Sequence, residues 1–109
     1  MENVIDLTNF LEIVGDDIEL KKELFEDFIK ASEDNIREMA KAIFSEDYTQ
    51  WKTNAHLLKG ASQNLGAVTL GLCASHAESQ SDQALWPKIL EDVGNLYLGV
   101  KTFLLKDIG

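Results

Sequence analysis

DDIELKKELFEDFIKASEDNIREMAKAIF, residues 16–44, is the longest uninterrupted pattern in this 109-residue chain. Its inward-facing positions recur at alternating intervals of four and three residues: Phe25, Ile29, Ser32, Ile36, Met39 and Ile43. That spacing places them along one side of an α-helix. The stretch therefore predicts a long amphipathic helix, which Asp16 or Asp17 can cap at its start.

Further helices are predicted on both sides of this stretch. They cover residues 7–14, 48–65 and 67–81, and a last helix holds Pro87 in its first turn and runs to Lys106. The segment 82–85 is predicted to be a loop. The apolar seams of the last three helices are expected at Trp51, Ala55, Leu58, Ser62 and Leu65; at Leu70, Cys73 and Ala77; and at Ile89, Val93, Leu96, Val100 and Phe103. Short connections between four substantial helices favour an all-α, antiparallel up-down four-helix bundle with a short extra N-terminal helix. We expect one domain over residues 1–109.

Composition narrows the classes of function. The net charge of −9 argues against binding to nucleic acid and to anionic membrane surfaces. No apolar run approaches the ~20 residues that a membrane-spanning helix needs, and the N-terminus lacks the pattern of a signal peptide. A single cysteine, Cys73, excludes an internal disulfide and fits a reducing compartment. These features predict a cytoplasmic protein.

The acidic residues are distributed unevenly. Eleven of them fall within residues 16–47, whereas residues 48–77 contain none. Buried helices contain few acids, which explains part of this gap. The remainder predicts a neutral-to-positive surface on an acidic body, suited to a partner with an acidic site.

The acid-free window contains HLLKGASQNLGA, residues 56–67. On a helical wheel His56 lies about 140° from the centre of the predicted core face, so it should point to solvent. The nearby positions Lys52, Lys59, Gly60 and Gln63 fall within about 60° of it. Gly60 costs roughly 1 kcal/mol in a helix interior relative to alanine. Close helix packing could require it, but its position beside His56 favours clearance for an approaching molecule.

Elimination narrows the role of this histidine. The two histidines are twenty residues apart, without the convergent ligands that a metal site needs. No serine or cysteine with an orienting acid accompanies His56, so a hydrolytic nucleophile is not indicated. A neutral imidazole can itself attack a phosphoryl group, and Lys59 one turn away can balance the phosphoryl charge.

The run resembles the motif of the histidine-containing phosphotransfer (HPt) domains of two-component phosphorelays, H-x-L-K-G-x-[SA]-x-x-[LIF]-G. The matching residues are His56, Leu58, Lys59, Gly60, Ser62, Leu65 and Gly66. The resemblance implies that His56 accepts the phosphoryl group, that Lys59 stabilises its charge, and that Gly60 clears space for a receiver domain. It also implies that Glu78 holds the imidazole tautomer, and that His76 has no functional role.

The resemblance implies a carrier rather than a kinase. The sequence agrees with this, because it contains no nucleotide-binding glycine motif. The expected partners are response-regulator receiver domains and a hybrid histidine kinase, and Lys52, Gln63 and Glu78 are expected to contact them. The chain itself should need no cofactor, since Mg²⁺ is expected on the receiver domain, and we expect a monomer. The alternative is an interaction module that binds receivers without accepting phosphate.

Overall fold

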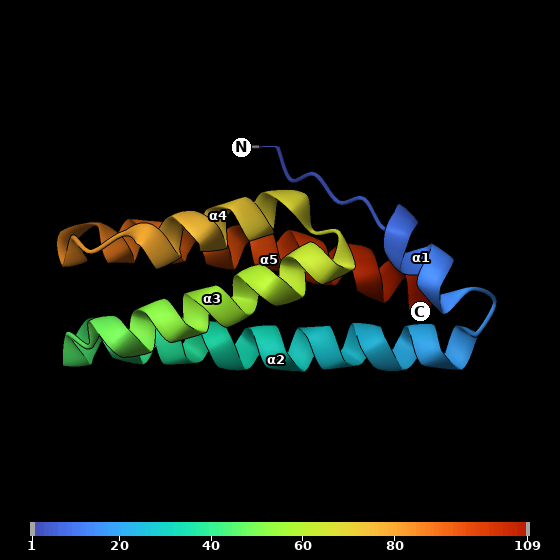
Figure 1. Ribbon diagram of the computed structural model, residues 1–109, viewed down its shortest axis with the longest axis horizontal. Coiled ribbons are helices and arrows are strands. Elements are labelled where there is room, and N and C mark those ends of the chain that lie inside the picture. The colour runs from blue at the N-terminus through green and yellow to red at the C-terminus, as the bar shows by residue number, and fades with distance from the viewer. Residues whose placement is uncertain (1, 109) are drawn as a thin grey trace.

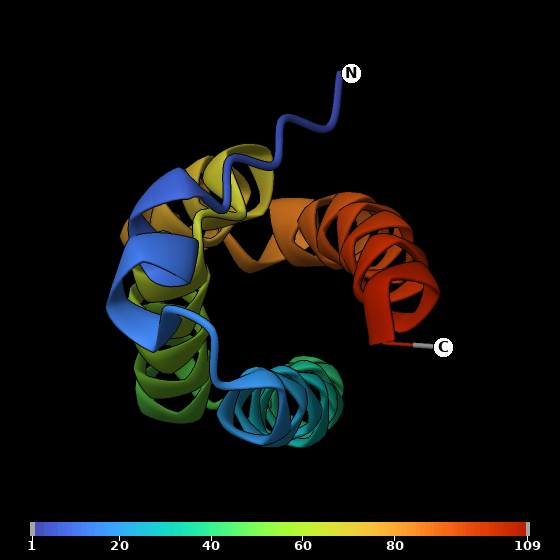
Figure 2. The ribbon, with the colours of Figure 1, turned by 90° about the vertical axis from the view of Figure 1, so that its right-hand side faces the viewer.

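The computed structural model describes residues 2–108 and is almost entirely helical within them. Its helices are α1 (Thr8–Val14), α2 (Ile18–Ser45), α3 (Tyr48–Leu65), α4 (Val68–Ser79), the 3₁₀ turn η1 (Gln83–Leu85) and α5 (Trp86–Ile108). Helices α2 to α5 alternate in direction along the long axis of the molecule (Figure 1). Viewed from the end, they surround a common core, and α1 covers the end of α3 (Figure 2). The predicted fold class, an antiparallel four-helix bundle with a short N-terminal helix, is confirmed.

Local sequence explains where the long helices start and stop. Asp17 and Asp47 cap α2 and α3, because their carboxylates accept the backbone N–H groups of Leu20 at 2.9 Å and Gln50 at 3.0 Å. Gly66 ends α3 in the left-handed conformation, with φ of 104°. The segment predicted as a loop over 82–85 instead contains the 3₁₀ turn, which Asp82 begins by accepting the N–H of Ala84.

The core contains the predicted seams with two corrections. All five residues expected on the core face of α3 are buried. In α5, Leu104 is fully buried while Phe103 remains 46% exposed, so the prediction for Phe103 was wrong. Cys73 is only half-buried, at the edge of the core rather than inside it.

Aromatic stacking closes the end of the bundle where α3 begins. The indole rings of Trp51 and Trp86 are nearly parallel, with centroids 4.6 Å apart, and both are fully buried. Their N–H groups donate to the carbonyls of Ala77 and Gln80 at the end of α4. Helices α3, α4 and α5 are therefore fixed to one another at that end.

The segment before α1 lies along α4 and α5. The Thr69 hydroxyl accepts the N–H of Val4 at 2.8 Å and donates to the carbonyl of Glu2 at 2.9 Å. The side-chain amide of Asn3 donates to the carbonyl of Leu96 on α5. We call residues 2–6 the N-terminal strap, because these bonds join the start of the chain to α4 and α5. Within residues 2–108, no helix combines the length and apolar character needed to cross a membrane.

Candidate functional site

His56 lies in the middle of α3 with its ring directed outward. Trp51, Ala55 and Leu58 hold the opposite face of the helix in the core, which fixes the direction of the imidazole. The His56 side chain is 60% exposed. The ring is therefore accessible to another macromolecule while its helix stays anchored.

Glu78 on α4 contacts both His56 and Lys59. Its Oε2 lies 2.8 Å from Nδ1 of His56, and its Oε1 accepts a hydrogen bond from Nζ of Lys59 at 2.7 Å. Lys59 is the largest cause lowering the pKa of Glu78 below its ordinary value; the bond from His56 adds to this effect and partial burial opposes it. Glu78 is therefore an ionised, acceptor-only group at neutral pH.

The contact with Glu78 determines which nitrogen of His56 is free. A carboxylate can only accept hydrogen bonds, so a neutral imidazole must donate its Nδ1–H to Glu78. The lone pair then resides on Nε2, the ring nitrogen that does not contact Glu78, in a side chain that is largely exposed. The arrangement supplies an oriented nitrogen nucleophile.

Gly60 lies one turn after His56 and meets no neighbouring element. A Cβ atom built on it has nothing within 4 Å beyond its own helix backbone. Close helix packing therefore does not require this glycine. The absence of a side chain at Gly60 instead leaves free space on the solvent side of α3.

Lys52, one turn before His56, is exposed and helps to line a shallow hollow of about 220 Å³. Thr53, His56, Leu57 and Glu78 complete the lining. No carboxylate of the described chain lies within ion-pair distance of Lys52. Its ammonium is thus available to a partner, whereas that of Lys59 is already bound to Glu78.

Two other residues considered in the sequence, Gln63 and His76, do not contact His56. Gln63 is exposed and packs toward α4, where a Cβ on Gly71 would meet its Cγ at 3.4 Å. It makes no hydrogen bond with His56 within residues 2–108. His76 lies about 160° around α4 from Glu78 and takes no part in the site. Among the described residues, no group of three or more His, Cys, Asp or Glu side chains could hold a metal ion.

A profile of the Hpt domain family matches residues 23–106, which is most of the chain and includes the whole site. The chain belongs to the Hpt domain family. Comparison with curated protein sequences gave no match. As a member of this family, the chain is a phosphorelay Hpt protein, and the resemblance noted from residues 56–66 is confirmed.

A solved structure shares the fold of this Hpt domain. The crystal structure of histidine-containing phosphotransfer protein B (HptB) from Pseudomonas aeruginosa PAO1 superposes with a TM-score of 0.84. The two sequences are 24% identical, and the match covers 94% of this chain and 89% of that chain. The helical arrangement is therefore common to both proteins.

The sequence did not indicate two features of the Hpt site. Leu57 is 52% exposed beside His56, which its position about 120° from the centre of the predicted core face could have suggested. An apolar hollow of about 270 Å³ also opens between α1, α2 and α3, lined by residues including Phe10, Ala61 and Asn64. Both features place apolar surface on the α1–α2 side of the Hpt motif.

Proposed function

We propose that this Hpt domain carries a phosphoryl group on Nε2 of His56 between the receiver domains of a phosphorelay. The observation that carries the proposal is the contact of Nδ1 with Glu78. It leaves the nucleophilic nitrogen on the exposed side of α3, beside a position without a side chain at Gly60. Family membership supports the same conclusion.

In the forward step, the lone pair of Nε2 attacks the phosphorus of a receiver's phospho-aspartate. The N–P bond forms as the bond from phosphorus to the aspartyl oxygen breaks, and the carboxylate leaves with the electron pair. The ring keeps its Nδ1–H and becomes positively charged, so the carboxylate of Glu78 stabilises it. In the reverse direction, the aspartate of another receiver attacks phosphorus and the imidazole leaves as a neutral ring.

Charge balance around the phosphoryl group involves two lysines. Lys59 is held by Glu78 in this structure, and its ammonium can turn to a phosphoryl oxygen once His56 is modified. Lys52 is exposed and can meet the acidic site of the receiver. Mg²⁺ is expected on that receiver, bound by its own carboxylates, and this chain needs no cofactor.

The receiver is proposed to dock on the surface around His56. The exposed side chains of Leu57 and Leu11, with the hollow beside Phe10, offer apolar contact on one side of His56. Gln63 extends the polar rim toward α4. The proposed partners are response-regulator receivers and a hybrid histidine kinase in the cytoplasm, with this chain acting as a monomer and without kinase activity of its own.

Incubation with a phosphorylated receiver domain tests the proposal. The expected product is a phosphoprotein that is labile in acid and stable in alkali, and His56→Gln should carry no label. His76→Gln is the matched control and should be labelled like the wild type. Label that persists in His56→Gln would contradict the assignment. Complex formation without any label would favour the alternative, a receiver-binding module that accepts no phosphate.

A further inference from the structure

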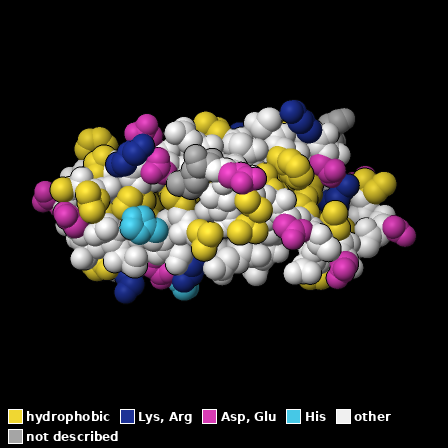
Figure 3. All heavy atoms as spheres, turned by 90° about the horizontal axis from the view of Figure 1, so that it is seen from above, with side chains coloured by type: hydrophobic (Ala, Val, Ile, Leu, Met, Phe, Trp, Pro, Cys, Tyr) yellow, Lys and Arg dark blue, Asp and Glu magenta, His cyan; other side chains and the backbone are white. Residues whose placement is uncertain are grey.

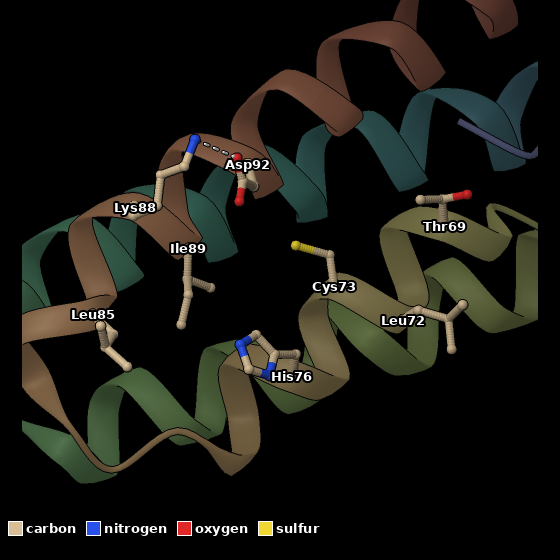
Figure 4. Close-up of a pocket in the computed structure, with 8 residues that line it drawn as sticks. All are labelled: Thr69, Leu72, Cys73, His76, Leu85, Lys88, Ile89 and Asp92. Carbon is tan, nitrogen blue, oxygen red and sulfur yellow. Dashed lines mark ion pairs between the residues drawn. The ribbon is translucent and has the colours of Figure 1, made fainter. Parts of the chain in front are cut away.

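A second surface lies on the other side of α4 from the phosphoryl site. Helices α4 and α5, with the turn that joins them, enclose a groove of about 560 Å³. Its lining residues are Thr69, Leu72, Cys73, His76, Leu85, Lys88, Ile89 and Asp92. Figure 4 shows Cys73 and Ile89 projecting from facing helices into the space between them. We call this surface the α4–α5 groove.

The two walls of the groove have the same spacing. Residues 69, 72, 73 and 76 line it from α4, and residues 85, 88, 89 and 92 line it from the other side. Both sets follow i, i+3, i+4, i+7, the pattern by which a helix presents one face to a packed neighbour. Each wall therefore extends over about two turns, or roughly 10 Å. Such a pair of parallel stripes is suited to a third helix lying between them.

The interior of the groove is apolar. Ile89 forms part of its base and is only 6% exposed, whereas Leu72 is 67% and Leu85 47% exposed at its borders. Burial raises the pKa of the Cys73 thiol, so this group stays neutral and acts as an apolar contact. The hydroxyl of Thr69 is already bonded to the N-terminal strap. Apolar side chains of a partner can therefore be buried against Cys73 and Ile89, while the imidazole of His76, which is exposed, keeps its contact with solvent.

Charge distinguishes between a second copy of this chain and a different partner. The one lysine in the groove, Lys88, pairs with Asp92 at 3.0 Å and so attracts no further anion. The chain as a whole carries −9, and the exposed Asp82 and Glu91 adjoin the residues of the second wall, so two copies repel each other, whereas a basic segment is attracted. Figure 3 views the side of α4 and the N-terminal strap, where hydrophobic side chains lie among scattered charged groups.

We propose that the α4–α5 groove binds an amphipathic, basic helix of another protein. The apolar stripe of that helix inserts between Leu72 and Leu85 over Ile89, and the cationic side chains that border the stripe face the acidic body. The groove residues of α4 lie about 140–180° around the helix from Glu78, apart from Leu72 at about 120°. The groove can therefore be occupied while a receiver is docked over His56.

A designed peptide serves as the probe. It has about 18 residues, since shorter isolated helices are marginal in water, with leucines at i, i+3, i+4 and i+7 positions and lysines and glutamines elsewhere. A peptide of the same composition in scrambled order, which lacks the apolar stripe, is the first control. Titration of the full ¹⁵N-labelled chain, followed by amide NMR shifts, should show saturable binding of the patterned peptide alone. The shifted amides should lie in residues 68–79 and 83–92.

Two matched leucines locate the contact. Leu72→Ala should weaken peptide binding about tenfold, because it removes an anchor at the groove border. Leu98→Ala should leave binding unchanged, because Leu98 is similarly exposed, at 57%, on a different face of α5. Neither side chain is buried, so both variants should keep the wild-type amide spectrum outside the substituted region.

Several results would overturn the proposal. One is equal binding of the scrambled peptide, which would show that binding depends on the charge of the peptide and not on its apolar stripe. Others are shifts centred on His56, equal weakening by Leu72→Ala and Leu98→Ala, or self-association of the chain through this face in sedimentation. Saturable binding of a small amphiphile without binding of the peptide would also overturn it. The readout needs no phosphoryl transfer, so its failure is distinguishable from failure of the proposed carrier function.

Discussion

At the residue scale, Gly60 separates the requirements of stability from those of function. Its position is helical and meets nothing within 4 Å. We expect Gly60→Ala to raise the free energy of unfolding by about 1 kcal/mol, the difference in helix propensity. We expect Gly60→Leu to keep the fold but slow phosphoryl exchange with a receiver at least tenfold, because the side chain occupies the approach to His56. Urea denaturation and a transfer time course measure the two effects.

Gly94 provides the control for this prediction. It lies inside α5, and a Cβ there also has nothing within 4 Å. Gly94→Ala should give a similar gain in stability, and Gly94→Leu should leave transfer unchanged. A wild-type transfer rate in Gly60→Leu would remove the steric role of the glycine.

Glu78 gives a prediction about pH. Because its pKa is lowered in the folded state, its bonds to Lys59 and His56 contribute above the ordinary carboxyl pKa of about 4.3. That contribution is lost as the pH falls through the lowered value. Lys59 is the largest cause, so Lys59→Gln should raise the titration midpoint of the Glu78 carboxyl carbon, measured by ¹³C NMR. Lys101→Gln removes an equal charge from a lysine bound to Glu33 and should leave that midpoint unchanged. An unaltered midpoint in Lys59→Gln would contradict the assignment.

At the scale of the elements, Gly66 joins three segments of the chain. A Cβ there would overlap the backbone carbonyl oxygen of Asp6, which no rotation of a side chain can relieve. The N–H of Asp6 donates to the carbonyl of Gly66 at 2.8 Å, so the close approach belongs to the docking of the strap on the α3–α4 turn. The last glycine of the motif therefore supports the strap as well as the end of α3.

We expect Gly66→Ala to cost more stability than Gly15→Ala. Both glycines have positive φ, 104° and 62°, but Gly15 has nothing within 4 Å of the added atom. Gly15→Ala should cost roughly 1–3 kcal/mol from the backbone alone, because a φ of 62° with a ψ of −135° is a conformation that residues with a side chain rarely adopt. Gly66→Ala should cost about 1–3 kcal/mol beyond that, the range for overpacking. Thermal or urea unfolding of the two variants measures the difference, and equal losses would show that the strap yields freely.

The same elements show how far the sequence alone could predict the fold and the site. Periodicity identified the core face of α3 because its large apolar residues Trp51, Leu58 and Leu65 all lie on one side of the helix. It failed at the end of α5, where adjacent apolar residues compete and helix packing decides for Leu104 over Phe103. The bond between Lys59 and Glu78 was also missed, since it depends on how α4 crosses α3 and not on the pattern within either helix.

At the scale of the whole molecule, the position of a charged residue should affect docking of a receiver more than the net charge of the chain does. The chain carries −9, yet residues 48–77 have no acid, and the exposed Lys52 lies in that window beside His56. An acidic receiver site would thus approach an acidic body beside Lys52, where the carboxylate of Glu78 is already bound to Lys59 and His56. The orientation of docking then depends on the local field, which acts over a Debye length of about 8–10 Å.

Lys52→Glu and Lys30→Glu separate the effect of local charge near His56 from the effect of net charge, because each substitution lowers the net charge by the same amount. Lys30 is exposed on α2, among acidic residues. We expect Lys52→Glu to slow association with a phosphorylated receiver about tenfold at low salt, measured by stopped-flow mixing, and Lys30→Glu to change it less than twofold. The difference should shrink toward 1 M salt, where the Debye length falls to about 3 Å. Equal slowing by both substitutions would mean that net charge governs the encounter and that the acid-free window does not orient it.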